Sequence, residues 1–287
     1  MERFCREDVR DLSLTQAFYK LLDENKEYWC SLSTLYRLFR ARGLNARRAP
    51  TRKARLRSRP TAYSAEKPNE VWTWDITYLR SSTYTGRFYY AYVIVDVYSR
   101  MVVSARVFDA DNADFAVRFL GDAFRKYGIR PGQLVVHSDN GASMKAAPTM
   151  ALLEKNGIIF SHSRPRVSND NPYSESFFRT LKYSGDCLYP RDGFNSVEEA
   201  EQWVQSFVEH YNEHHRPRGI RMVTPGQRYR CEDAEVLRRR RETMLEARRN
   251  HPERWIGDSV LNCTPIGRVW LNPENGQLEE KRLPGAA

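Results

Sequence analysis

The sequence predicts an α/β protein in which a mixed sheet is flanked by helices, with a helical region before it. Stretches 71–79, 88–97 and 101–108 have the length and the apolar, β-branched and aromatic composition of strands. A helical repeat over 112–127 and a short apolar strand at 134–136 follow them. Three strands, a helix, a strand and then further helices form the order expected of a mixed α/β domain.

The N-terminal region, residues 1–46, has the pattern of two short helices joined by a tight turn. Leu14 and Phe18 recur at helical spacing, and a second helix can begin after Ser31 and end at Gly43. This second helix is basic on its polar side, so the pair is expected to read DNA as a helix-turn-helix, with an ordinary helical hairpin as the alternative. The residues of this helix predicted to contact DNA are Arg37 and Arg40.

A strongly basic segment, residues 47–68, comes next and contains no acid before Glu66. Such a segment repels itself and has little apolar surface to bury, so it is predicted to be a linker. It can also follow the phosphates of DNA as an extended arm. The side chains predicted to contact DNA here are Arg47, Arg48, Arg52, Lys53, Arg55 and Arg57.

The core is expected to span residues 69–230. Side chains alternate within 71–79, which places Trp74 and Asp75 on opposite faces of the first strand. Stretch 88–97 is almost continuously apolar, as in a strand buried on both faces. The later elements are expected to be helices at 149–156, from Pro172 onward and at 197–210, and a short strand at 158–160.

The C-terminal region, residues 231–287, is expected to form a charged helix followed by a tail with several prolines and glycines. Four consecutive arginines at 238–241 lie in this helix, among acids. They are interpreted as a solvated helix face rather than a dedicated site.

Charge and cysteine usage narrow the class of protein. The net charge of +10 and the pI near 9.4 favour a polyanionic partner, most often nucleic acid. Apolar runs fall well short of the roughly 20 residues of a membrane span, and the charged start has no secretory core. Five scattered cysteines without a CxxC pair argue against a disulfide framework and a thiolate zinc site, and fit a reducing cytoplasm.

Three acids occupy positions that suit a catalytic site. Asp75 lies mid-strand, Asp139 stands where a buried strand ends in a turn, and Glu175 lies one turn into a helix. Sites in open α/β sheets form at the carboxyl ends of strands. Mg and Mn ions prefer oxygen ligands, and a pair of ions can activate the attacking oxygen and stabilise the leaving oxygen of phosphoryl transfer. Three carboxylates are the minimal set for two ions, so these acids are the candidate catalytic and metal-binding residues.

Two further acids are expected to have structural roles. Asp96 ends the buried second strand, where we expect it to accept hydrogen bonds. Asp170 is expected to shape the turn before the helix that starts at Pro172.

The segments around the three acids resemble the signature of the DDE integrase and transposase superfamily. These segments are Thr-Trp-Asp-Ile-Thr at 73–77, His-Ser-Asp-Asn-Gly at 137–141 and Tyr-Ser-Glu-Ser-Phe-Phe at 173–178. Thirty-five residues separate Asp139 from Glu175, which is the D,D-35-E spacing of that superfamily. Residues 69–227 are similar to the second-frame product of the IS-three family of bacterial insertion sequences, with matching segments at 72–78, 96–100, 163–165, 211–212, 216–217 and 224–225.

The resemblance implies a ribonuclease H-like fold and a polynucleotidyl transferase that cleaves DNA ends and transfers strands. Asp75, Asp139 and Glu175 would hold two Mg or Mn ions. A basic residue of the family contacts the DNA end, and Lys182 stands at its position, seven residues after Glu175 on the same helix face. An exposed helix lysine without this role is the alternative. Arg164, inside a matching segment, is also predicted to contact DNA.

The resemblance also implies partners. These are DNA, as terminal inverted repeats and target, other copies of the chain on that DNA, and a protein encoded in the upstream frame. The HHCC zinc module of retroviral integrases has no counterpart here, so no structural zinc is expected. The implied location is the bacterial cytoplasm, in association with the nucleoid. A ribonuclease H-like nuclease or resolvase that cuts without joining is one rival reading, and a non-catalytic DNA-binding regulator is another.

Overall fold

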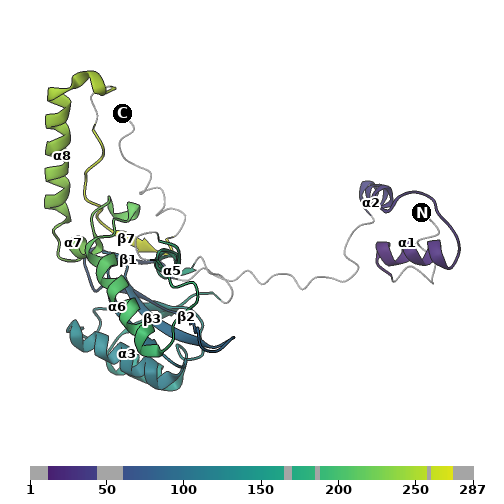
Figure 1. Ribbon diagram of the computed structural model, residues 1–287, viewed down its shortest axis with the longest axis horizontal. Helices are drawn as coiled ribbons and strands as arrows, with labels where there is room; N and C mark the ends of the chain where they lie inside the picture. Colours follow the sequence, from purple (N-terminus) through teal and green to yellow (C-terminus); the bar gives the residue numbers. More distant parts are fainter. Residues whose placement is uncertain (1–11, 44–60, 165–169, 185–187, 257–259, 274–287) are drawn as a thin grey trace. The chain divides into compact units, whose positions relative to one another are not determined.

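The computed structural model describes residues 12–43, 61–164, 170–184, 188–256 and 260–273. The chain divides into two compact units, Met1–Arg57 and Ser58–Ala287 (Figure 1). Each unit has a hydrophobic core of its own. The basic residues predicted to contact DNA from the linker lie outside the described residues; they are Arg47, Arg48, Arg52, Lys53, Arg55 and Arg57.

The N-terminal unit contains two described helices, α1 (Leu14–Asp23) and α2 (Leu32–Ala41). Ser13 and Ser31 cap them, because each hydroxyl accepts a hydrogen bond from an N–H of the first turn that has no partner within the helix. The two helices pack through Ala17, Leu21, Leu35 and Phe39. The expected tight turn is wrong: residues 24–31 separate the helices, and Lys26 adopts a left-handed conformation within that connection.

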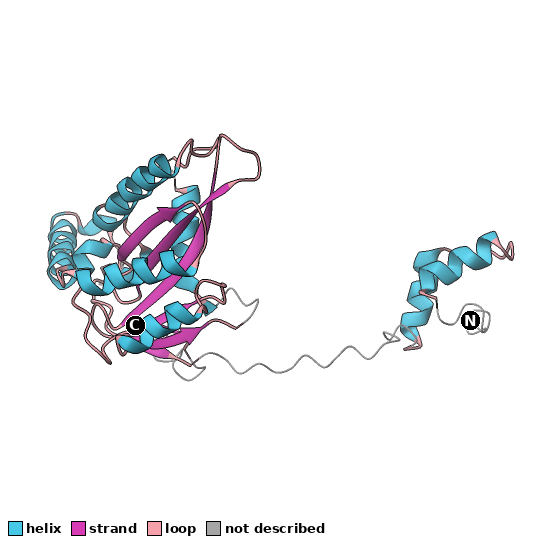
Figure 2. Cartoon of the chain, turned by 90° about the horizontal axis from the view of Figure 1, so that it is seen from below, coloured by secondary structure: helices cyan, strands magenta, loops and turns pink. Residues whose placement is uncertain are grey.

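The second unit is built on a five-stranded sheet with the order β4-β3-β2-β5-β6. Its strands are among those drawn in magenta in Figure 2. Its strands are β2 (Val71–Arg80), β3 (Phe88–Asp96), β4 (Val102–Phe108), β5 (Val135–Ser138) and β6 (Ile159–His162). Strands β2, β3 and β4 pair antiparallel, whereas β5 is parallel to both β2 and β6. Three antiparallel strands beside two parallel ones make the ribonuclease H-like arrangement, so the expected fold class is confirmed.

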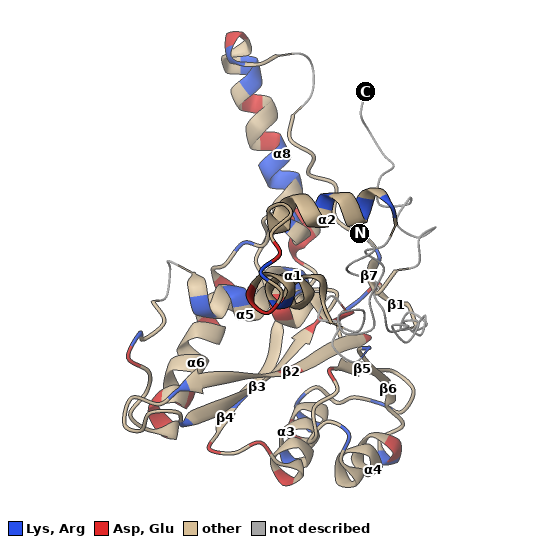
Figure 3. Ribbon diagram, turned by 90° about the vertical axis from the view of Figure 1, so that its right-hand side faces the viewer, with Lys and Arg blue, Asp and Glu red and all other residues tan. Residues whose placement is uncertain are grey.

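Helices cover both faces of this sheet (Figure 3). The helices are α3 (Ala113–Lys126) and α4 (Ala147–Lys155) on one face, and α5 (Pro172–Tyr183) and α6 (Val197–Glu213) on the other. Along β2, Trp72 and Trp74 are buried against α3, whereas Leu79 is buried against α5 and α6. Alternation along the strand therefore turns Asp75 toward the α5 side.

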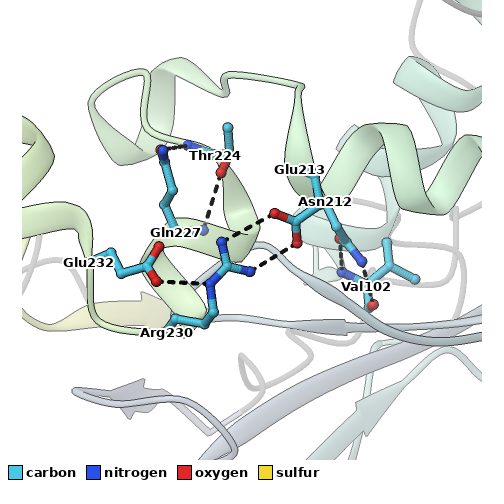
Figure 4. Close-up of polar contacts among 7 residues, drawn as sticks. All are labelled: Val102, Asn212, Glu213, Thr224, Gln227, Arg230 and Glu232. Carbon is cyan, nitrogen blue, oxygen red and sulfur yellow. Dashed lines mark hydrogen bonds and ion pairs between the residues drawn. The ribbon is translucent and has the colours of Figure 1, made fainter.

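Strand β4 lies at the edge of the sheet, and side chains of α6 bond its outward-facing backbone groups. The Asn212 amide accepts from the Val102 N–H at 2.9 Å and donates to the Val102 carbonyl at 3.0 Å (Figure 4). Gln205 donates to the Ala105 carbonyl at 2.7 Å. These bonds occupy groups through which an edge strand could pair with another chain.

Buried Arg228 joins the C-terminal segments to the core. The further helices are α7 (Pro225–Tyr229) and α8 (Asp233–Asn250), with short 3-10 helices η3 (Arg218–Ile220) and η4 (Pro252–Arg254). The Arg228 guanidinium donates to the Tyr98 carbonyl at 2.8 Å and pairs with Asp233 at 2.9 Å. It also donates to the Ile266 carbonyl at 2.7 Å, which anchors the segment returning after α8.

A two-stranded sheet closes this unit and changes two expected boundaries. Strand β1 (Tyr63–Ala65) pairs antiparallel with β7 (Val269–Leu271). The first lies inside the expected linker, 47–68, and the second inside the expected tail, so both segments contribute structure to the core unit. The arginines of α8 lie among acids as expected, and Arg238 and Arg239 pair with Glu235.

Among the described residues, none of the helices combines the length and the apolar composition that a membrane crossing requires.

Candidate active site

Parallel pairing of β2 with β5 places the first two candidate acids at adjacent positions. Trp74 is the register partner of Ser138, the last residue of β5. The next residue on each chain is the candidate acid, Asp75 on β2 and Asp139 directly after β5. Both side chains are partly buried. The Asp75 carboxylate accepts a hydrogen bond from the Ile76 N–H at 2.8 Å.

Helix α5 carries the third acid, Glu175, in its first turn. Pro172 is the first residue of the helix, where the backbone N–H that a proline lacks would have no partner within the helix. The buried Ser174 hydroxyl donates to Thr73 Oγ1 at 3.1 Å, and Thr73 lies two residues before Asp75. This contact fixes the start of α5 on the strand that carries Asp75.

The C-terminal strand supports the same turn of α5. The hydroxyl of Tyr173 donates to the carbonyl of Trp270 in β7 at 2.6 Å. The guanidinium carbon of Arg100 lies over the ring of Tyr173, 3.8 Å from the ring centroid. Tyr173 and Arg100 lie in matching segments, but the sequence assigned neither a role, because these contacts join residues that are far apart in the chain.

The electrostatics of Asp75 link the three acids. Burial, and next the charge of Asp139, raise the pKa of Asp75 to about 7, with a further contribution from Glu175. The Ile76 N–H and the charge of Lys182 act in the opposite direction. Lys182 is half-buried in the last turn of α5, where burial lowers the pKa of its ammonium group and the charge of Asp75 opposes that effect.

The donor chemistry of this site fits a divalent cation. Among the described residues, no group of three or more acidic, histidine or cysteine side chains lies close enough together to hold a metal ion. Carboxylate oxygens are nevertheless the ligands that Mg and Mn prefer. After burial, repulsion between the carboxylates is the next cause of the raised pKa of Asp75, and a bound cation would neutralise that repulsion. Asp75 and Asp139 would hold such an ion, and Glu175 lies within electrostatic reach of Asp75.

The structure confirms the structural role expected for Asp96. This fully buried carboxylate accepts from the Asn69 N–H at 2.9 Å, from the Ser99 N–H at 2.8 Å and from the Ser99 hydroxyl at 2.6 Å. It stabilises the turn after β3. Burial raises its pKa to about 6, against the effect of these hydrogen bonds.

Asp170 lies two residues before α5 and pairs with Arg164; its expected role in the turn stays a prediction, because residues 165–169 lie outside the described part of the chain. The Arg164 guanidinium donates to both Asp170 carboxylate oxygens, at 2.9 and 2.8 Å, and its backbone N–H donates to one of them at 2.8 Å. The Arg164 side chain lowers the pKa of Asp170. The predicted DNA contact of Arg164 stays a prediction, and this ion pair gives the residue a second, structural task.

His137 and Ser163 lie in segments that match the family, but the sequence alone assigns neither a role. Both are buried beside Asp139, and the Ser163 hydroxyl donates to Asp139 Oδ1 at 2.7 Å. Burial lowers the pKa of His137 to about 4. The other predicted DNA-contacting residues, Arg37 and Arg40, are exposed on α2 of the N-terminal unit.

A ribonuclease H-like sheet with one carboxylate midway along β2 and another directly after the parallel strand β5 defines an integrase-like core. Family models described as "Integrase core domain" match residues 65–168 and 156–225. An uncharacterised transposase-like protein of Haemophilus influenzae is 30% identical, over 55% of this chain and 68% of its own length. The chain belongs to the integrase core domain family, among the DDE transposases of the retroviral integrase superfamily.

Other relatives are transposases of bacterial insertion sequences. The putative transposase InsK of element IS150 in Escherichia coli is 29% identical over 57% of this chain and 55% of its own length. The transposase of element IS904 in Lactococcus lactis is 33% identical over 56% of this chain and 62% of its own. This chain thus spans between about half and two thirds of the length of these relatives.

Similar solved structures come from retroviruses. A chain of the simian T-cell lymphotropic virus intasome has a TM-score of 0.46 and 16% identity, and the match covers 69% of this chain and 66% of that one. The catalytic core domain of BIV integrase has a TM-score of 0.39 and 22% identity, covering 56% of this chain and 93% of that one.

Proposed function

We propose that this protein is a transposase that cleaves DNA at the ends of an insertion sequence and joins those ends to target DNA. The observation that carries the proposal is the convergence of Asp75 and Asp139 on adjacent parallel strands, with Glu175 supplied by α5. Membership of the DDE transposase family agrees with this chemistry.

The reaction has two phosphoryl transfers at one site. Water first attacks the phosphorus at the element end, which breaks the bond to the 3′ oxygen and leaves a 3′-hydroxyl on that end. That hydroxyl then attacks a phosphodiester of the target, forming a new phosphorus–oxygen bond and releasing a target 3′-hydroxyl. Two Mg or Mn ions, when bound, would supply activation of the attacking oxygen and stabilisation of the leaving one.

The residues of the site divide these tasks. Asp75, Asp139 and Glu175 hold the cations, with Asp75 at the centre because both other acids act on its charge. Lys182 shares the helix of Glu175 and is attracted by Asp75. Its ammonium group binds a phosphate of the DNA end and keeps it beside the carboxylates.

Basic residues outside the core bind the rest of the DNA. Arg37 and Arg40 read the terminal repeat, and the linker arginines and lysine follow its phosphates. Two element ends must be held together for joining, so the active form is a multimer on DNA. A protein from the upstream frame takes part in that assembly, at the bacterial nucleoid.

The test is a strand-transfer assay with Mg or Mn and cloned ends of the source element. Asp75→Asn, Asp139→Asn and Glu175→Gln are each expected to abolish cleavage and joining while DNA binding in a gel-shift assay is retained. Asp114→Asn is the matched control, because Asp114 is exposed in the first turn of α3. It should be active.

The outcomes separate the rival functions. Full joining by the Asp75→Asn protein would exclude the proposed site. Cleavage without joined product by the wild-type protein favours a nuclease or resolvase, and specific DNA binding without cleavage favours a regulator.

A further inference from the structure

We propose that Ser163, itself oriented by His137, is a positioning residue that fixes the carboxylate of Asp139 for metal binding. The inference rests on the proposed function, since it assigns Asp139 to a divalent cation. It begins from the 2.7 Å hydrogen bond that the Ser163 hydroxyl donates to Asp139 Oδ1. That bond joins the residue directly after β5 to the residue directly after β6.

Backbone groups of Ser163 form hydrogen bonds with the residue before Asp139 and with the residue after it. Its N–H donates to the carbonyl of Ser138 at 2.9 Å, which continues the pairing of β5 with β6. Its carbonyl accepts a hydrogen bond from the side-chain amide of Asn140. Because Ser138 and Asn140 flank Asp139 in the chain, the position of Ser163 relative to this acid is set by three separate contacts.

The direction of each hydrogen bond follows from the chemistry of its atoms. A carboxylate oxygen can only accept, so the single hydroxyl proton of Ser163 points to Asp139. The contact of 3.1 Å between His137 Nε2 and Ser163 Oγ then requires Nε2 to be the donor. On the other side of the ring, Ser161 Oγ lies 3.0 Å from His137 Nδ1 and holds the imidazole in place. His137 therefore fixes the Ser163 hydroxyl in the rotamer that serves Asp139.

The Ser163 hydroxyl is uncharged, and an uncharged partner suits a carboxylate that binds a metal ion. The buried Asp170 has a guanidinium partner, Arg164, whose charge offsets its own. Asp139 has a hydroxyl partner instead, which orients the carboxylate and leaves its negative charge available to a cation. Oδ2 of Asp139 accepts no hydrogen bond from any described residue. Hydrogen bonds from outside the ligand shell that orient ligating side chains commonly set metal affinity.

The test measures Mn²⁺ binding to the full chain without DNA, from the electron paramagnetic resonance signal of free Mn²⁺. Ser163→Ala is expected to raise the Kd for Mn²⁺ by about 10- to 100-fold. Ser163→Thr keeps the hydroxyl and should retain most of the affinity.

Ser99→Ala is the matched control. It removes the 2.6 Å hydrogen bond between a buried serine and Asp96, an acid outside the site. It should lower the melting temperature and leave the Kd for Mn²⁺ at the wild-type value.

Three results would overturn the inference: an unchanged Kd in a folded Ser163→Ala protein, equal losses of affinity in Ser163→Ala and Ser99→Ala, or no Mn²⁺ binding by the wild-type chain. The strand-transfer assay keeps this inference distinct from the proposed function. A wild-type chain that binds Mn²⁺ but neither cleaves nor joins DNA refutes the proposed function, and a selective loss of affinity in Ser163→Ala still supports the role of Ser163.

Discussion

Replacing Asp75 with asparagine is expected to stabilise the metal-free protein at neutral pH, although it removes a carboxylate that we propose holds a catalytic metal ion. Ionised Asp75 is partly buried and lies within electrostatic reach of Asp139 and Glu175. In the absence of a cation, folding forces these negative charges together. Asparagine has nearly the same shape and carries no charge, so the variant avoids that repulsion.

The size of the effect follows from the pKa of Asp75. Burial and then the charge of Asp139 raise this pKa from 3.8 to about 7. At about 1.4 kcal/mol for each pKa unit, the difference of roughly 3 units corresponds to about 4 kcal/mol. Solvent screening at a partly exposed side chain reduces the expected gain to about 2–3 kcal/mol.

The sign of the pH dependence follows from the difference between the pKa of Asp75 in the folded protein and its pKa in the unfolded chain. The folded protein keeps the Asp75 proton up to its higher pKa, whereas the unfolded chain releases it near 3.8. The free energy of unfolding of the wild-type protein therefore falls as the pH rises between about 4 and about 7. Above that window the contribution of Asp75 no longer changes. The advantage of Asp75→Asn should grow across the same window and then stay constant.

Urea unfolding in EDTA, followed by tryptophan fluorescence, measures this difference. Trp72 and Trp74 are fully buried on the strand that carries Asp75 and report on its unfolding. Added Mn²⁺ should stabilise the wild-type protein and have little effect on Asp75→Asn. A stability difference that is the same at about pH 5 and about pH 8 would refute the reasoning.

Three further substitutions test the packing around the site. Arg228→Met leaves buried Asp233 without a counter-charge, so the free energy of unfolding in urea should fall by about 3–5 kcal/mol and proteolysis within 260–271 should become faster. A urea midpoint equal to that of the wild-type protein would contradict this. Asn212→Leu leaves the edge of β4 unpaired, which should cost about 1–3 kcal/mol and increase light scattering at high concentration, and an equally stable, monodisperse variant would count against the edge argument. Tyr173→Phe loses one hydrogen bond to β7 and should cost about 1 kcal/mol with Mn²⁺ binding retained; a large loss of Mn²⁺ affinity would assign Tyr173 a greater part in placing Glu175.

Local patterns in the sequence were sufficient to predict the frame of the candidate site. Alternation along β2 placed Asp75 opposite Trp74, and the break after a short apolar strand marked Asp139. A proline at the start of a helical repeat marked the helix of Glu175. These signals are local because side-chain periodicity and helix starts depend on neighbouring residues. The same reasoning assigned Asp96 a structural role, which its three hydrogen bonds confirm.

The errors fall where no local signal exists. Strands β1 and β7 have three residues each, too few to show alternation, and they were interpreted as linker and tail. Their pairing depends on partners far apart in the chain. The connection 24–31 was expected to be tight, because helix periodicity does not report the length of a loop.

The sequence by itself determined the order of strands and helices from β2 to α6, the positions of the three acids and the family, since each depends on residue identity and short-range spacing. Only the tertiary structure decided how the acids act on one another and what surrounds them. The raised pKa of Asp75 comes from burial and from charges brought in by β5 and α5. The chain of hydrogen bonds from His137 through Ser163 to Asp139 exists because β5 and β6 pair in parallel with a particular register. Burial and register are properties of the assembled sheet, which is why local patterns could not predict them.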